Sequence, residues 1–180
     1  MLVTYAASMA IREGVHKLGP ANGTLWVRTE RTGAAAKAGH NLYIEVTAWE
    51  ATLEATSLEL RADATSLRVR EGTGGMQKLG DDGKQNIEQT IDDEVLKRTD
   101  IVYRSSAVRD DGATLHVEGE LTLFGATRPL ALALAAEGDR LTGSAVVKQT
   151  DWGMKPYSGL FGALKVVDEV TVGVEATLPQ

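Results

Sequence analysis

The stretch at residues 112–135 constrains the fold more than any other part of the chain, because apolar and polar side chains alternate along it. Leu115 and Val117 fall on one parity, and His116 and Glu118 fall on the other. A strand sends successive side chains to opposite faces. The pattern therefore predicts a long strand with one buried face and one solvated face.

A second alternating run follows a short break and predicts a hairpin. The alternation stops at residues 124–127 and resumes at Leu130, Leu132 and Leu134, directly after Pro129. Proline lacks an N–H donor and so suits the first position of a strand. Two alternating runs joined by a short glycine-containing link are typical of an antiparallel hairpin. One face of this hairpin has to be buried against the rest of the chain.

Similar alternation recurs elsewhere and predicts eight or so strands in total. Further runs lie at residues 25–29, 42–53, 58–62, 67–69, 101–104, 141–147 and 170–178. Within the second of these runs the apolar parity shifts between Val46 and Ala51, as it does at a β-bulge that bends a sheet. One helix is expected at about 84–97, with Asp82 as its N-cap, because isoleucine and valine recur there at a spacing of four residues.

Antiparallel strands with hairpin links and one helix leave two architectures, a two-sheet sandwich and a closed up-and-down barrel. The near-continuous strand order favours the barrel, in which the C-terminal strand pairs with an early strand and no edge stays exposed. We therefore expect an all-β, antiparallel, eight-stranded β-barrel. A barrel of this size is filled by side chains or holds one small ligand. Several residues on the inward parity are small and favour a hollow barrel: Ala62, Gly119, Gly143, Ala145 and Ala176.

Charge and composition narrow the classes of function. The net charge of -6 and the pI near 5.1 argue against a nucleic-acid partner and against docking on an anionic membrane surface. No run approaches the roughly 18 apolar residues of a membrane span. The chain has no cysteine, no histidine pair with metal-ligand spacing and no nucleotide-binding or hydrolase motif. We therefore predict no catalytic residues, no metal and no cofactor.

The first 23 residues read as an N-terminal extension, and residues 24–179 as the barrel domain. The extension has no basic segment ahead of an apolar segment, so it does not read as a signal peptide. A cytoplasmic location is the expectation that follows.

Two motifs resemble those of the YceI-like family. The run GELTLFGATRPLALAL is similar to the family's signature hairpin, through Gly119, Glu120, Leu121, Thr122, Leu123, Gly125, Thr127, Arg128 and Pro129. Phe124 stands where the family often has histidine. The TDWG run at residues 150–153 is similar to the family's Ser/Thr-Asp-aromatic-Gly motif, and a weaker match covers the expected helix and the strand after it. The resemblance extends over residues 24–179.

The resemblance implies a lipocalin-like barrel that binds polyisoprenoids or isoprenoid quinones in an elongated internal pocket. We expect sequestration of such a long apolar or amphiphilic molecule, with a homodimer as one assembly that the sequence allows. Two alternatives stay open: an enzyme acting on the same ligand, with Tyr103, His40 or Asp151 as its titratable group, or a stress-related interaction module with a filled core. Many relatives of this family are secreted.

The expected ligand-binding residues come from the inward parities, the helix face and the aromatic residues of the glycine-rich segment. They are Val27, Ile44, Ile87, Ile91, Tyr103, Leu121, Trp152, Tyr157 and Phe161. The helix face is either a movable lid or a static cap. The aromatic side chains of the glycine-rich segment either line the mouth of the pocket or plug the end of the barrel.

Overall fold

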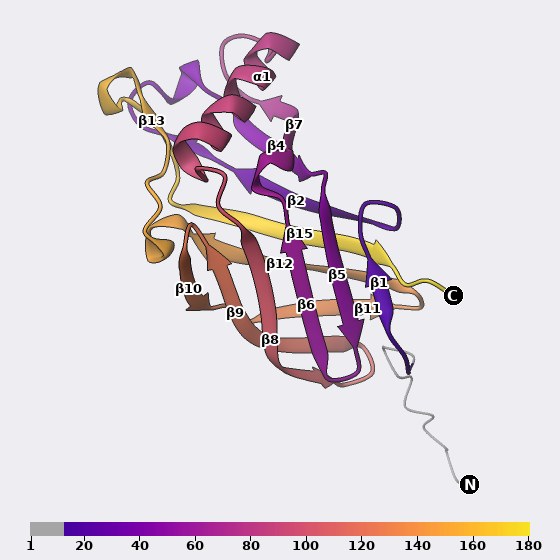
Figure 1. Cartoon of the computed structure of the whole chain (residues 1–180). Coiled ribbons are helices and arrows are strands. Elements are labelled where there is room, and N and C mark those ends of the chain that lie inside the picture. The colour runs from indigo at the N-terminus through magenta and orange to yellow at the C-terminus, as the bar shows by residue number, and fades with distance from the viewer. Residues whose placement is uncertain (1–12) are drawn as a thin grey trace, which may run out of the picture.

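The computed structural model describes residues 13–180, and most of this part folds into one antiparallel sheet that curls into a barrel (Figure 1). Residues 1–12, which belong to the expected N-terminal extension, lie outside the described residues. The main sheet contains β1 (His16–Leu18), β2 (Gly23–Thr29), β4 (Asn41–Val46), β5 (Trp49–Glu54), β6 (Ser57–Ala62), β7 (Leu67–Thr73), β8 (Ile101–Asp110), β9 (Thr114–Leu123), β10 (Ala126–Pro129), β11 (Leu132–Glu137), β12 (Arg140–Lys148) and β15 (Glu169–Thr177). A second, small sheet contains β3 (Arg31–Thr32), β13 (Ser158–Gly159) and β14 (Leu164–Val166).

The expected all-β antiparallel fold is confirmed, but the count of eight strands is wrong, because the main sheet has twelve strands within residues 13–180. Two long stretches bend and are thereby split in two. Thr47 and Ala48 separate β4 from β5, and a short 3-10 turn, η2 (Ala64–Ser66), separates β6 from β7. The two bends are held together by bonds from the Thr47 N–H to the Ser66 carbonyl and from the Asp63 N–H to the Ala48 carbonyl, both 2.9 Å. The short strands β1 and β10 are the other two strands beyond the expected eight.

The pairing explains how the sheet curls. The C-terminal strand β15 lies between β12 and β2, so the end of the chain pairs with an early strand. β4 pairs with β2 and β7, whereas β5 pairs with β6, which in turn pairs with β8. Since β4 runs on into β5 and β6 into β7, these pairs continue around the molecule through the two bends. Alternate side chains of every strand consequently face one interior.

The central hairpin is present with a different turn from the one expected. β9 pairs with β10 along one half and with β11 along the other. The strand after the turn begins at Ala126 and has Pro129 as its last residue, and the expected alternating strand follows as β11, which begins at Leu132. Phe124 and Gly125 make the turn in left-handed conformations, with φ of 52° and 74°. Such a turn reverses the chain within two residues, which is shorter than the break in the alternation at residues 124–127.

The helix starts earlier and ends differently than expected. α1 runs over Asp81–Thr90, and a π-helical turn, η3 (Ile91–Val95), continues it. Gly80 is the N-cap in place of Asp82, which lies inside the first turn, where its charge complements the helix dipole. The π-helical turn arises because the Leu96 N–H bonds to the Ile91 carbonyl, five residues back.

The two ends of the barrel differ. Helix α1 and the β13 segment lie at one end, whereas the β5–β6 and β8–β9 hairpins turn at the other (Figure 1). Leu53, Leu115 and Leu141 are almost fully buried, and each lies close to one of the hairpin turns of that second end. Buried leucine side chains therefore close the barrel at the hairpin end.

Candidate ligand-binding cavity

The interior of the barrel is a cavity of about 610 Å³. This volume falls within the range of roughly 300–1,000 Å³ that is typical of small-molecule sites. Its walls are the inward side chains of the strands, and residues of α1 and η3 cover one opening. Most of these side chains are leucine, valine, isoleucine or alanine. Such a lining offers an apolar molecule a dry environment and few hydrogen bonds.

Seven of the nine expected ligand-binding residues line this cavity. They are Val27, Ile44, Ile87, Ile91, Tyr103, Leu121 and Tyr157. They come from three parts of the chain: the inward parity of the strands, one face of the α1–η3 helix, and the segment that leads into β13. The structure brings all seven around one space. That they contact a ligand stays a prediction.

Trp152 is not among the cavity-lining residues. It is the last residue of η4 (Gln149–Trp152), a 3-10 turn that ends at Gly153 in a left-handed conformation. The side chain is buried, and its indole Nε1–H donates to the Leu121 carbonyl oxygen at 2.9 Å. Trp152 therefore packs as core against the strand that forms the cavity wall.

Phe161 is not in the lining either and points into solvent, where it is fully exposed. It lies in η5 (Leu160–Gly162), the turn between β13 and β14. The backbone of Phe161 has φ of 57°, which differs from the helical conformation of an ordinary 3-10 turn. Spacing in the sequence gave no sign of this conformation, because left-handed residues in such turns are usually glycine or asparagine.

Several lining residues were not expected. Trp49 is not among the ligand-binding residues expected from the sequence, but it is buried and lines the cavity. It shares its parity with Ala51 and Leu53, so the phase shift after β4 was the signal that places it inward. Arg31 and Lys165 also line the cavity, from β3 and β14. No pattern predicted these two, because the strands of the small sheet are only two or three residues long.

Tyr103 supplies a hydroxyl to the apolar wall. Its O–H donates to the Leu130 carbonyl oxygen at 2.8 Å, and burial raises its pKa to about 12. Gly119 makes this possible, because a Cβ there would stand 2.7 Å from the Tyr103 hydroxyl and 2.4 Å from the Arg104 carbonyl. Gly119 therefore does not add room to the cavity, unlike the other expected small residues, which line it.

The part of the cavity beside the small sheet, which we call the mouth, carries positive charge. Arg31 and Lys165 are charged members of the lining, and the part of the lining contributed by residues 13–180 includes no aspartate or glutamate. The Arg31 guanidinium donates to the Thr73 carbonyl at 2.9 Å. His40 is nearby, and its Nε2–H donates to the Gln77 carbonyl at 2.6 Å. A bound molecule would therefore meet two cations at the mouth and mostly aliphatic side chains in the rest of the cavity.

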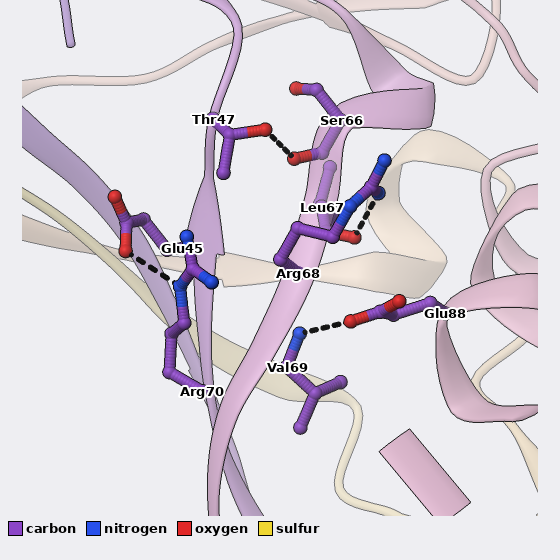
Figure 2. A network of polar contacts seen from close by, with 8 residues as sticks. All are labelled: Glu45, Thr47, Ser66, Leu67, Arg68, Val69, Arg70 and Glu88. Atoms are coloured by element: carbon purple, nitrogen blue, oxygen red, sulfur yellow. Dashed lines mark hydrogen bonds and ion pairs between the residues drawn. The ribbon is translucent and has the colours of Figure 1, made fainter. Parts of the chain in front are cut away.

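Helix α1 is attached to the barrel wall by a carboxylate. Figure 2 shows Glu88 reaching from the helix to β7, where its Oε1 accepts the Val69 backbone N–H at 2.9 Å. β7 ends the hydrogen-bonded strand order of the main sheet, and this N–H would otherwise lack a partner on that side. Glu88 therefore satisfies the strand edge and fixes the helix so that Ile87 and Ile91 cover the cavity.

The groups considered for catalysis are not assembled into one site. Tyr103 and His40 line the cavity, whereas Asp151 is exposed and lies outside the lining. Among the described residues, no group of three histidine, aspartate or glutamate side chains is placed to hold a metal ion. No helix in that same part of the chain is both long enough and apolar enough to cross a membrane.

Comparison with known proteins gives one family and one fold. A model of the YceI-like domain matches residues 21–178. The crystal structure of BcnA from Burkholderia cenocepacia superposes with a TM-score of 0.60 over 85% of this chain and 94% of BcnA, at 14% identity. The YceI protein of Campylobacter jejuni superposes with a TM-score of 0.51 over 76% of this chain and 85% of its own, at 13% identity. A stretch of 63 residues is 44% identical to protein TraI of Escherichia coli, but it covers 33% of this chain and only 9% of TraI.

Proposed function

The chain belongs to the YceI-like family, and from this premise we propose that it binds a long apolar or amphiphilic molecule, of the polyisoprenoid or isoprenoid quinone class, inside its barrel. The observation that carries the proposal is the cavity of about 610 Å³, whose walls are mostly aliphatic. A protein that only needed a core would fill this space, because interiors are normally packed without voids of such size.

The driving force is the burial of apolar ligand surface. Each Å² of apolar surface removed from water contributes about 25 cal/mol, before the costs of ordering the ligand are subtracted. A flexible chain loses much freedom on binding, so affinity depends on how completely the cavity encloses it. The scarcity of polar groups in the wall favours selection by shape over selection by hydrogen bonds.

The two ends of the cavity orient the ligand. Leu53 and Leu141 close the deep end with buried aliphatic surface. Arg31 and Lys165 lie at the mouth, where a polar head group keeps contact with water. We therefore place the hydrocarbon tail towards the hairpin turns and the head group beside the small sheet.

A pair of neighbouring substitutions tests binding inside the barrel. Ala145 lines the cavity, whereas the next residue, Val146, points outward from the same strand and is 57% exposed. Ala145→Phe places a ring in the cavity, and Val146→Phe adds the same ring to the outer wall. Binding of a soluble prenyl quinone analogue is measured by titration for both variants, and native mass spectrometry of freshly purified protein identifies any lipid that it carries.

We expect the wild-type protein and Val146→Phe to bind alike, and Ala145→Phe to bind at least about tenfold more weakly, which corresponds to about 1.4 kcal/mol. Circular dichroism checks that both variants are folded. Wild-type protein that neither carries nor takes up any prenyl lipid or quinone would contradict the proposal, and so would equal affinities of the two variants.

An enzyme acting on the same ligand is the less supported alternative. The Tyr103 hydroxyl is engaged by the Leu130 carbonyl, and its raised pKa makes it a poor base near neutral pH. The cytoplasmic location, the homodimer and the boundary between an extension and the barrel at residue 23 also remain proposals. Size-exclusion chromatography with light scattering tests the assembly.

A further inference from the structure

Three loops surround the open end of the cavity and are bonded to one another. These mouth loops are residues 31–40, 73–80 and 153–166. The Ala35 N–H bonds to the Ala163 carbonyl at 2.8 Å, and the Met76 N–H bonds to the Lys37 carbonyl at 2.9 Å. The pairing of β3 with β14 also joins the first loop to the third. The mouth loops therefore form one connected rim.

The mouth loops carry positive charge in an otherwise acidic chain. Their charged side chains are Arg31, Lys37, Lys78, Lys155 and Lys165. All 25 aspartate and glutamate residues of the protein lie outside these three segments. The nearest in sequence to the second loop, Asp81 and Asp82, occupy the first turn of α1, where they complement the helix dipole. The rim is thus locally cationic although the net charge is -6.

The same loops expose large apolar side chains to water. Within residues 13–180, six large hydrophobic residues are exposed, and four of them belong to the mouth loops. These four are Met76, Tyr157, Leu160 and Phe161. Tyr157 also lines the cavity, so one of these exposed side chains borders the site directly. Clustered exposed apolar side chains at the rim of a binding site mark a surface that meets an apolar partner.

The turn that presents Leu160 and Phe161 is strained. Both residues are left-handed, with φ of 51° and 57°. Glycine or asparagine adopts this conformation at lower cost than leucine or phenylalanine. In the described part of the chain nothing covers the Phe161 side chain, which is fully exposed. Packing inside the protein therefore does not explain why two bulky apolar residues stand here.

We propose that the mouth loops dock on an anionic lipid bilayer. Leu160 and Phe161 insert at the boundary between head groups and acyl chains, and the five cations face the lipid phosphates. Apolar residues flanked by lysine and arginine are the combination that binds such interfaces. Docking points the cavity mouth at the bilayer, where an apolar ligand is dissolved. The purpose of the docking, which is ligand exchange with the membrane, rests on the proposed function, whereas the docking itself does not.

The net charge of -6 argues against docking on an anionic membrane. The distribution of the charges explains why docking is still favourable. The Debye length at physiological ionic strength is about 8 Å, so carboxylates elsewhere on the barrel are largely screened from a surface that the rim touches. A lysine close to an anionic membrane strengthens binding by about fivefold. Several such residues on one rim can therefore outweigh distant acidic residues.

Flotation of the full chain with vesicles tests the proposal. The vesicles contain phosphatidylcholine, with or without phosphatidylglycerol, and no added ligand. The variants are Leu160→Ser/Phe161→Ser, which removes the apolar tip, and Lys37→Gln/Lys155→Gln, which removes two cations. Val146→Ser is the matched control, because Val146 and Leu160 are each 57% exposed and Val146 lies on the outer wall of the barrel.

We expect the wild-type chain and Val146→Ser to float with phosphatidylglycerol vesicles, and the apolar double variant to lose at least about 90% of this binding. The lysine double variant should bind about tenfold or more weakly, and added salt should reduce the difference. Failure of the wild-type chain to float, or equal flotation of all variants, would overturn the proposal. So would a wild-type dimer in sedimentation that Leu160→Ser/Phe161→Ser dissociates, because the tip would then bind a second copy.

Two further measurements separate docking from folding and from ligand binding. Phe161→Gly relieves the strained turn, so its melting temperature should equal or exceed that of the wild type while its flotation falls. Titration with a soluble ligand in vesicle-free buffer reports the cavity alone. Normal flotation with no ligand uptake would overturn the proposed function and support the docking surface. Ligand uptake without flotation would overturn the docking surface and support the proposed function.

Discussion

The indole Nε1–H of Trp152 donates to the carbonyl oxygen of Leu121 at 2.9 Å. These residues belong to the two motifs that carry the family resemblance, the TDWG run and the signature hairpin. Leu121 faces the cavity, and Trp152 packs as core beside its strand. The two motifs are therefore joined directly by a hydrogen bond.

Trp152→Phe should lower the free energy of unfolding by roughly 0.5–1.5 kcal/mol, because it removes the hydrogen bond between the buried indole and the Leu121 carbonyl. Trp152→Ala should cost about 3–5 kcal/mol, because it also leaves a cavity. Urea denaturation followed by circular dichroism measures both values. Trp26→Phe is the control, because Trp26 is only half-buried and lies against Tyr43 and Arg28. Equal losses at both positions would show that the Trp152 hydrogen bond contributes little.

Glu88→Ala should loosen helix α1 from the barrel, because the Val69 N–H loses its acceptor. Exchange of that amide hydrogen should become at least about fivefold faster, as expected for the loss of roughly 1 kcal/mol. Nuclear magnetic resonance of the labelled protein follows the exchange directly. Gln89→Ala is the control, since Gln89 is exposed on the same helix. Unchanged protection of Val69 in Glu88→Ala would mean that apolar packing alone holds the helix.

Alternation in the sequence predicted the strands well because each strand has one face against a single interior. It predicted neither the number of strands nor the bend between β6 and β7, since such a bend depends on bonds between distant segments, such as Thr47 with Ser66. The parity shift near Ala51 did mark one bend. Its consequence, an inward Trp49, was missed because the shift was treated as local.

Periodicity also predicted one part of the candidate site and not the other. The residues placed by periodicity, such as Val27, Ile44 and Ile87, do line the cavity. The irregular segment was not predictable in this way, because its aromatic residues follow no period. Turn conformations place Trp152 inside and Phe161 outside, and the left-handed φ of Phe161 contradicts ordinary residue preference.

The free energy of unfolding should fall between about pH 10 and pH 12, and part of this fall should come from Tyr103. Its pKa is raised to about 12 in the folded protein against an ordinary value near 10. Between these two pH values the folded state keeps the phenolic proton that the unfolded state loses. The contribution of Tyr103 to the free energy of unfolding is therefore complete below pH 10 and disappears as the pH rises through 12. Tyr103→Phe should be less stable than the wild type at pH 8, because the Leu130 carbonyl loses its donor. The difference in free energy of unfolding between the two proteins should shrink as the pH rises from 10 to 12. Urea denaturation at matched ionic strength measures it, and a difference that stays constant would contradict the raised pKa of Tyr103.

Ligands with an anionic head group should bind more tightly than neutral ligands with the same chain, because Lys165 and Arg31 lie at the mouth of the cavity. A long-chain fatty acid and the corresponding fatty alcohol provide the comparison. Lys165 is exposed, so we expect a preference of only about two- to fivefold for the acid at low salt, as for other exposed ion pairs. Salt should weaken the preference.

Substitution of Lys165 separates charge from packing. Lys165→Gln should reduce the preference for the fatty acid and leave the affinity for the alcohol unchanged, whereas Lys165→Arg should retain the preference because the charge is kept. Competition titrations in vesicle-free buffer give both affinities for each variant. A preference that survives Lys165→Gln would assign the head group to Arg31 alone. An alcohol that binds as tightly as the acid in the wild type would place the head group away from both cations.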